Sequence, residues 1–565
     1  MKFSDYTYTR PDYEQVKANF TDLVARLKEV TSLEETREVV SQISAILNQI
    51  DTQYNLWMIR HSIDMTDSFY NEETTFWNQY TPLFDELTTS YYSVIVNSPF
   101  RSDLADLLPD TFFKLAENKL KTFSADLIPL FQKENELVDS YNNLIAGAAI
   151  SFQGKIYNLS QMGPFTQSTD REVRKAATDA VVAFLTQKEK DFDSIYDQLV
   201  HVRTEIAQKL GFKDYVEYGY LKMNRFDYNR DMVKVYREEI LTHIVPIVQK
   251  LRQRQAKRLQ LPQLSYYDLN LEFVDGNAKP QGDPDFIVKQ AQEMYQELSA
   301  ETGEFFNFMI EHDLLDLVAK TGKDSGGYCT YIPDFKSPFI FSNFNGTSAD
   351  IDVLTHEAGH AFQVYRSRWI QCPEAIWPTF ETCEIHSMSM EFLTWPWMER
   401  FFKDEVDKYK FSHLASTLLF LPYGVLVDHF QHEVYENPTM TPAERKATWA
   451  RLQEIYLPDR NYSESEALSR GIFWFRQGHI FSSPFYYIDY TLAQVCALQF
   501  WKRTHVDQDE QAWTDYLRIC DLGGTKSFLQ VVNAANLKSP FKEGALKSTA
   551  QAAADWLDAI DDSAF

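Results

Sequence analysis

Apolar residues recur at helical spacing along most of the chain, and this pattern predicts a mainly α-helical fold. Residues 21–50, TDLVARLKEVTSLEETREVVSQISAILNQI, fit two amphipathic helices separated just before Ser32. Ser32 and Glu35 fit a capping box, in which both side chains satisfy free N–H groups at the start of the second helix. The same spacing continues through residues 124–150 and 171–212. We therefore expect helices to dominate the first two hundred residues.

β-rich patterns gather in one stretch, residues 325–347, with the sequence SGGYCTYIPDFKSPFIFSNFNGT. Paired glycines open the stretch, alternating and aromatic residues follow, and Asn345-Gly346 gives a turn signal at its end. A small sheet or hairpin is therefore expected directly before residues 349–366. Residues 259–286 carry several Pro and Gly residues and predict a long loop between helices.

Residues 349–366, ADIDVLTHEAGHAFQVYR, form the segment that this small sheet leads into. Thr347 and Asp350 fit a capping box, so we expect a helix to begin there and to end at about residues 366–368. Gly359 lies inside this helix, where glycine costs about 0.5–1 kcal/mol relative to alanine. We expect Gly359 to allow the close approach of another backbone.

The same helix carries the H-E-x-x-H pattern of His356, Glu357 and His360. His356 and His360 lie one turn apart and project from one face, so their imidazoles can bind one ion together. Glu357 is offset by about 100° and lies beside the ion, where it can hold a water molecule. The spacing predicts a zinc site in which Glu357 acts on that water.

A catalytic zinc site needs a third protein ligand. A metzincin continuation would require glycine at 363 and histidine at 366, and the chain has Gln363 and Arg366 there. A carboxylate is the next option, and Glu381, Glu384 and Glu391 share one face of the following predicted helix. The pattern favours Glu384 over Glu381 only slightly, so both stay open at this point.

Composition narrows the class of protein. The 565 residues have a formal net charge of -26, with 44% hydrophobic and 15% aromatic residues, as expected for a folded protein. This negative charge argues against nucleic acid and anionic membrane surfaces as partners. We read neither a signal peptide nor a transmembrane run, and the cysteines are scattered without a CxxC pair. We expect reduced thiols and a cytoplasmic protein.

Three motifs in this order carry a family resemblance: SPFIFSNFNGTSADIDVLTHEAGHAFQ (337–363), FETCEIHSMSMEFLTWP (380–396) and GHIFSSPFYYIDYTLAQV (478–495). With them the chain resembles the M3 family of zinc oligopeptidases, the thimet oligopeptidase-like family. It is most similar to the oligoendopeptidase F and Pz-peptidase branch. The resemblance covers roughly the C-terminal two-thirds, and the helical N-terminal part agrees with it.

The resemblance implies a specific set of ligands. The third zinc ligand of the family opens an E-x-x-S segment, which corresponds here to Glu384 followed by Ser387. Glu391 fits a further acidic position of the family. The resemblance therefore implies one zinc ion per chain, held by His356, His360 and Glu384.

The resemblance also implies a second wall across the cleft from the metal. His479 fits the family histidine, and Tyr490 fits the tyrosine that hydrogen-bonds the oxyanion. Tyr487 is the expected second tyrosine, while Tyr486 is expected to bind substrate. The spacing departs from other branches because a shorter segment containing Pro484 intervenes, which leaves open whether Tyr486 or Tyr487 faces the substrate.

The substrate cleft implied by the resemblance includes the loop before the first predicted strand. Gly326, Gly327 and Tyr328 are expected to line it, and an extended peptide could add to the strand edge through main-chain hydrogen bonds. His386 lies next to the third-ligand segment, and from this position we expect it either to contact substrate or to support a metal ligand from behind.

The implied fold is a bilobal helical ellipsoid with a deep central channel and a small β-sheet beside the zinc-site helix. Residues 1–190 would form a helical lobe, and residues 191–565 the catalytic domain. The expected function is zinc-dependent cleavage of internal bonds in short unfolded oligopeptides, with Glu357 as general base. A zinc exopeptidase and a non-catalytic peptide-binding protein are the alternatives, and oligomeric state stays unassigned.

Overall fold

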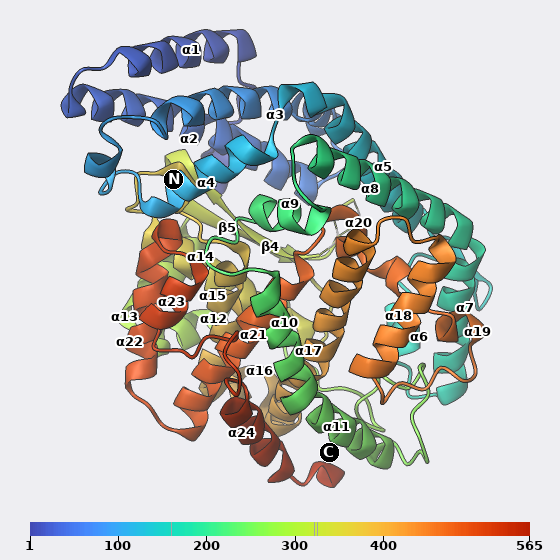
Figure 1. Cartoon of the computed structure of the whole chain (residues 1–565). Coiled ribbons are helices and arrows are strands. Elements are labelled where there is room, and N and C mark those ends of the chain that lie inside the picture. Colours follow the sequence, from blue (N-terminus) through green and yellow to red (C-terminus); the bar gives the residue numbers. More distant parts are fainter. Residues whose placement is uncertain (160, 321, 325) are drawn as a thin grey trace.

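The computed structural model of the chain describes residues 1–159, 161–320, 322–324 and 326–565, and helices make up most of it (Figure 1). Among these residues, β-structure is confined to a two-stranded and a three-stranded sheet. The predicted mainly helical fold with a small sheet beside the histidine-bearing helix is therefore confirmed. The predicted channel between two lobes stays a prediction.

The N-terminal part is a layer of long helices at one side of the molecule (Figure 1). Ser32 caps the second of them by accepting the N–H of Glu35, as predicted, while the Glu35 carboxylate accepts the N–H of Thr31. The helices are α1 (Tyr13–Glu29), α2 (Leu33–Ile63), α3 (Ser68–Ile95), α4 (Asp110–Thr122) and α5 (Ile128–Ala146).

The first four helices share a hydrophobic cluster that is separate from the main core. Phe20, Val40, Trp77 and Phe112 belong to it, and Val364 from the histidine-bearing helix also packs there. Most buried residues after position 116 belong to the larger cluster. The domain boundary predicted near residue 190 falls at the junction of two consecutive helices, and it stays a prediction.

In the part of the chain that the structure describes, the middle adds eight α-helices and one short hairpin. Strands β1 (Ile150–Phe152) and β2 (Lys155–Tyr157) pair around Gln153 and Gly154, both with positive φ. The sequence reading missed this hairpin because its strands have only three residues each. As predicted, the described residues 259–283 form neither a helix nor a strand. The helices are α6 (Gly163–Thr166), α7 (Arg171–Gln187), α8 (Glu189–Lys209), α9 (Tyr215–Lys222), α10 (Arg230–His243), α11 (Val245–Arg258), α12 (Pro284–Leu298) and α13 (Ala300–Glu311).

The three-stranded sheet lies where the sequence predicts it. Strands β3 (Leu315–Val318), β4 (Tyr328–Ile332) and β5 (Ser337–Phe344) have the order β3-β5-β4, so β4 is an outer strand. β5 pairs in parallel with β3 and antiparallel with β4. The chain then turns at Gly346, which has a φ of 85°, and enters the helix with the two histidines.

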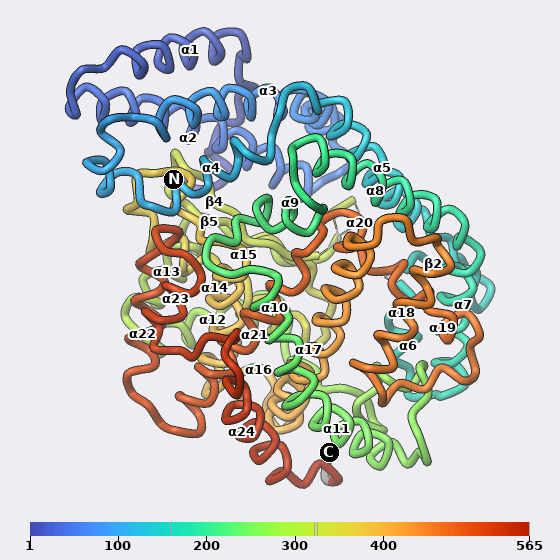
Figure 2. Tube along the Cα trace, in the orientation of Figure 1, coloured from blue at the N-terminus to red at the C-terminus, as the bar shows by residue number. Residues whose placement is uncertain are grey.

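The C-terminal part contains the helices that surround the candidate site. In Figure 2 the last, red part of the chain returns to lie beside the yellow-orange helices of this region. The helices are α14 (Ala349–Ser367), α15 (Phe380–Leu393), α16 (Glu399–Phe402), α17 (Val406–Glu436), α18 (Pro442–Tyr456), α19 (Glu466–Ser469), α20 (Gly478–Ser482), α21 (Tyr487–Trp501), α22 (Gln511–Leu522), α23 (Phe528–Ala534) and α24 (Lys547–Asp558).

Helix α14 begins at Ala349, with Ser348 as the residue before its first turn, and the predicted capping box is wrong. The Asp350 carboxylate accepts the N–H groups of Asn345 and Gly346, at 2.9 and 2.8 Å. Because the preceding turn offers these free N–H groups, the carboxylate ties the turn to the helix and leaves Thr347 without a capping role.

Helices α14 and α15 approach each other backbone to backbone at Gly359. A Cβ atom there would lie 2.6 Å from the carbonyl oxygen of His386 and 2.6 Å from the Cα of Ser387. The prediction that Gly359 allows close approach is confirmed. On its other side α15 packs against α21, which in turn packs against α17.

One described stretch, Glu399–Glu436, reaches the length and hydropathy of a membrane span. Of its most apolar window, 72% is buried inside the structure, as in the core helix of a soluble protein. All five cysteines are free thiols, in agreement with the sequence reading.

Candidate active site

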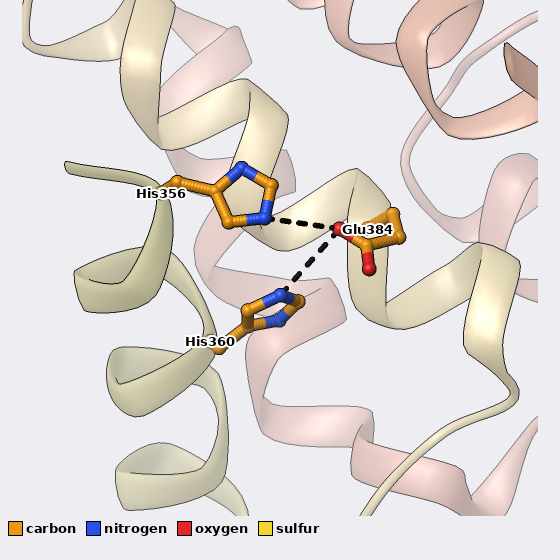
Figure 3. A group of neighbouring side chains, drawn as sticks. All are labelled: His356, His360 and Glu384. Atoms are coloured by element: carbon orange, nitrogen blue, oxygen red, sulfur yellow. Dashed lines mark ion pairs between the residues drawn. The ribbon is translucent and has the colours of Figure 1, made fainter. Parts of the chain in front are cut away.

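Three predicted ligands converge between α14 and α15 (Figure 3). Nε2 of His356 lies 3.2 Å and Nε2 of His360 lies 3.5 Å from the same carboxylate oxygen of Glu384. The ligand atoms all lie within 4.8 Å of one another, and no other described set of His, Cys, Asp and Glu side chains does so. The helical period places the two histidines, and the contact at Gly359 brings Glu384 to them.

Glu384 is held as an anion. Burial alone would raise the pKa of its carboxyl, but His360 and His356 beside it keep that pKa well below its usual range. Ser387, one turn further along α15, donates a hydrogen bond to Oε2 of Glu384 at 2.8 Å. The E-x-x-S spacing thus gives the carboxylate a fixed orientation.

Behind His356 lies a chain of buried hydrogen bonds. Nδ1 of His356 lies 2.7 Å from Oε1 of Glu391, and Nε2 of His413 lies 2.8 Å from Oε2 of the same carboxylate. Trp395 donates its indole N–H to Nδ1 of His413 at 2.9 Å. This donation fixes the proton of neutral His413 on Nε2, and Glu391 in turn holds the proton of His356 on Nδ1. Nε2 of His356 is therefore free to bind a metal.

The sequence analysis did not connect His413 with the site. His413 lies on α17, far along the chain from Glu391, and no local motif joins them. Glu391, in contrast, was singled out by its position on the face of Glu384.

Glu357 faces the same space from α14 with an unpaired oxygen. Its side chain is 6% exposed, and Oε2 has no hydrogen-bond partner among the described residues. Burial raises the pKa of this carboxyl. A Cβ atom on Gly327 would lie 3.7 Å from Oε1 of Glu357 and 2.9 Å from a methyl group of Val353. Glycine at 327 therefore keeps the space beside Glu357 open.

The facing wall comes from α20 and α21. Gln477 lies 3.0 Å, through Nε2, from Nδ1 of His479, and Tyr423 donates its hydroxyl to Oε1 of Gln477 at 2.7 Å. Tyr423 thus fixes the amide, whose N–H donates to His479 and leaves the imidazole proton on Nε2. Burial lowers the pKa of His479, so the ring is a neutral N–H donor.

The tyrosines beside His479 have different neighbours. The Tyr486 hydroxyl lies 3.5 Å from Oε1 of Glu384, and its ring packs on Tyr490 with centroids 5.1 Å apart. Burial, followed by the charge of Glu384, raises the pKa of Tyr490 to about 12. Tyr487 contacts the rings of Tyr423 and His479. The Tyr486 hydroxyl thus lies next to a predicted metal ligand and the Tyr487 ring lies beside His479, and the role of each tyrosine stays a prediction.

A cavity of about 380 Å³ adjoins this wall. Its lining includes Glu391 and Met388 from the metal side and His479, Tyr487 and Tyr490 from the facing side. Its volume lies within the range of about 300–1,000 Å³ that is usual for ligand pockets, so the cavity can hold part of a small ligand.

The remaining predicted substrate contacts have mixed outcomes. Gly327 reaches the site beside Glu357, and Gly326, with a φ of 86°, forms the turn before it. The Tyr328 ring stacks on Phe341, with centroids 4.8 Å apart, so the side chain packs on the sheet. His386 is fully buried in α15, which does not support the predicted contact with substrate.

The residues present fit a zinc ion. Two imidazoles and one carboxylate are the donor set typical of catalytic zinc, and Glu357 offers a free buried oxygen beside them. Together, the helix-borne histidine pair and the carboxylate from the neighbouring helix form a candidate metal site, with N–H and O–H donors on the facing wall.

The chain belongs to peptidase family M3. A model of the Peptidase M3 N-terminal domain matches residues 3–123, and a model of Peptidase family M3 matches residues 165–551. The predicted membership of the oligoendopeptidase F and Pz-peptidase branch is confirmed as well, because solved structures from that branch match the whole chain.

A structure of Pz peptidase A with an inhibitor is 51% identical and covers 100% of both chains, with a TM-score of 0.94. A candidate oligoendopeptidase F from Bacillus anthracis str. Ames is 52% identical over 100% of this chain and 99% of that chain, with a TM-score of 0.90. An oligoendopeptidase F homolog from Borreliella burgdorferi is 23% identical over 65% of this chain. The match spans 62% of the length of that curated relative.

Proposed function

We propose that the protein is a zinc-dependent endopeptidase that hydrolyses internal bonds of short unfolded oligopeptides. The observation that carries this proposal is the convergence of His356, His360 and Glu384 beside the unpaired carboxylate of Glu357. The membership of family M3 and the similarity to structures of oligoendopeptidase F support it.

The metal would be held by the two histidines and Glu384. When bound, zinc would supply Lewis acidity, which polarises a peptide carbonyl and lowers the pKa of water. Oε2 of Glu357 accepts a proton from the attacking water and later returns it to the leaving amine. Burial raises the pKa of Glu357, which makes its carboxylate a stronger proton acceptor than an exposed glutamate.

The facing wall stabilises charge on the substrate carbonyl oxygen. Tyr490 offers its hydroxyl, which stays protonated because its pKa is about 12, and His479 offers the N–H on Nε2. Such preorganised donors act strongly in a partly buried site because they need no reorganisation during the reaction. Tyr486, next to Glu384, is the second tyrosine of this wall.

The test is cleavage of a quenched fluorescent peptide that is blocked at both ends. Cleavage should stop with a chelator and return when zinc is added. Cleavage that persists without metal would refute zinc dependence. If the protein binds zinc and cleaves only unblocked peptides, it is an exopeptidase, and if it cleaves neither, it is a peptide-binding protein.

Two expectations, on binding partners and on cellular location, rest on the sequence alone. A net charge of -26 favours neither nucleic acid nor an anionic membrane surface as a partner. The cytoplasmic location stays a prediction, which cell fractionation with a specific antibody would check.

A further inference from the structure

A second cavity, of about 350 Å³, lies beside the facing wall. It is separate from the cavity of about 380 Å³ described above. It is lined by α7, α11, α17, the loop after α11 and the segment between α18 and α20. In Figure 1, α7 lies at the right, α17 nearer the middle and α11 towards the bottom. The lining is partly apolar, with Val181, Val182, Leu185 and Leu468, and partly polar.

The charge of this cavity contrasts with that of the whole protein. Arg252, Arg460 and Arg476 line it, and none of the described lining residues is an aspartate or a glutamate. The chain as a whole has a formal net charge of -26. A cavity with three guanidinium groups and no lining carboxylate is therefore an isolated positive site.

Few ion pairs or short hydrogen bonds within the protein balance the charge of Arg476 and Arg460. Among the described residues Arg476 has no ion pair or hydrogen bond, and it lies 5.5 Å from the centroid of the Phe473 ring. The hydrogen bond of Arg460 to the Tyr462 hydroxyl is long, at 3.4 Å.

Arg252 donates from Nη1 to Oε1 of Gln255 at 2.6 Å and to the carbonyl oxygen of Leu269 at 3.1 Å, while its Nε has no hydrogen-bond partner among the described residues. It reaches the carboxylates of Glu272 and Asp459 only at 3.9 and 3.6 Å. Burial, together with the neighbouring Arg460, lowers the pKa of Arg252. A bound anion would relieve this repulsion between the two guanidinium groups.

The cavity adjoins the facing wall, with which it shares side chains. Tyr487 lines both cavities, and its ring lies 5.0 Å from that of His479 and 5.8 Å from that of Tyr423. Gln477 also lines the positive cavity and contacts Nδ1 of His479. The arginines therefore lie on the other side of Tyr487 from the cavity beside the metal ligands.

We propose that this cavity is a substrate subsite that binds a carboxylate of the peptide, at a fixed distance from the scissile bond. The inference rests on the proposed peptidase function. Guanidinium groups bind carboxylates with paired, charge-assisted hydrogen bonds, and a partly buried site strengthens them. The carboxylate is either the free C-terminus of the peptide or an acidic side chain, and both present the same group to the arginines.

The experiment compares quenched peptides of one sequence that end in a free carboxylate or in an amide. A length series places the terminus one to five residues beyond the scissile bond, and an amidated set carries one aspartate at each of these positions. At one length, kcat/KM should be about tenfold higher for the free acid than for the amide, and 0.5 M NaCl should reduce this ratio. The aspartate set separates a terminal from a side-chain carboxylate.

Variants assign the preference to the cavity. Arg476→Gln removes an exposed, unpaired guanidinium and should reduce the acid-to-amide ratio to within about twofold of one. Arg460→Gln should do the same, with thermal unfolding measured to show that this buried substitution folds. Arg470→Gln is the matched control, because Arg470 is exposed, pairs with Glu189 and does not line the cavity. It should retain the native ratio.

A direct binding measurement separates this inference from the proposed function. The same free-acid and amide peptides, carrying a fluorophore, are titrated onto Glu357→Gln, and anisotropy gives their affinities. Tighter binding of the acid that Arg476→Gln abolishes supports the subsite, even if no peptide is ever cleaved. Equal affinity and equal kcat/KM for acid and amide at every length would overturn the inference and leave the peptidase proposal intact.

Discussion

The two walls of the candidate site are built in different ways. The metal-side wall consists of two long helices that touch backbone to backbone at Gly359, with buried hydrogen bonds behind His356. The facing wall consists of one short helix and the start of another, and its rings of His479 and Tyr490 are held mainly by contacts with other aromatic rings.

Because they are built differently, the two walls should control different properties, namely metal affinity and reaction rate. On the metal side, the ligand positions follow from helix geometry and from a set of largely buried hydrogen bonds, so a change there should affect metal affinity. The facing wall contributes hydrogen-bond donors. Among them, only Tyr486 comes close to a predicted metal ligand, Glu384, in the described residues. A change there should affect the reaction rate while the metal stays bound.

Glu357→Gln tests the one metal-side residue that is expected to act on rate. The amide cannot accept a proton, so kcat should fall by about 10³-fold, within the range for a general base. Zinc content, measured by atomic absorption, should stay at one ion per chain because Glu357 is not a ligand. Normal turnover in this variant would show that another group accepts the proton.

Tyr490→Phe tests the facing wall. Loss of one donor to the carbonyl oxygen should lower kcat by about 10²-fold, while KM and zinc content stay close to native values. Because the pKa of Tyr490 is about 12, its hydroxyl stays a donor throughout pH 6–10, so native activity should show no alkaline limb from this residue. Tyr487→Phe, which removes a hydroxyl further from Glu384, should have a smaller effect on kcat.

Glu391→Gln tests the metal side. In contrast to Tyr490→Phe, it should lower zinc affinity more than kcat. An amide pairs less well with the N–H groups of both His356 and His413, so His356 loses its fixed orientation. Zinc affinity, measured by competition with a fluorescent chelator, should fall about 10- to 100-fold. At saturating zinc much of kcat should return. Unchanged affinity would mean that Glu391 is only a packing residue.

The sequence predicted the metal side well because its chemistry follows the period of one helix. His356 and His360 are fixed by their spacing, and the small sheet before them is readable from its β-rich pattern. The choice between Glu381 and Glu384 could not be made from periodicity, since it depends on how α15 meets α14 at Gly359. The resemblance to family M3 supplied that choice.

Contacts between segments far apart in the chain, one on each wall, show where prediction from sequence stops. His413 reaches Glu391 from another helix, and Tyr423 reaches Gln477 across 54 positions of the chain. These contacts depend on tertiary packing, for which local patterns carry no signal. The sequence left the choice between Tyr486 and Tyr487 open for the same reason, because adjacent residues at a helix start diverge according to the rings around them.

Gln477 gives the finest test of the comparison, since it acts on rate only through the tautomer of His479. Gln477→Met removes the amide donor, frees the imidazole to exchange tautomers and should cost about 1 kcal/mol, roughly fivefold in kcat. Gln477→Glu should do more than remove a donor. Its carboxylate accepts from Nδ1, so in the neutral ring Nε2 loses its proton and its ability to donate.

The two substitutions should therefore differ in their dependence on pH. In Gln477→Glu the carboxylate raises the pKa of His479, and the imidazolium keeps the N–H on Nε2 below that pKa. Activity should be retained at low pH and lost as pH rises through the raised pKa, whereas Gln477→Met should show a uniform loss. Parallel pH profiles of kcat for the two variants would show that the tautomer of His479 does not matter, and that this wall acts through Tyr490 alone.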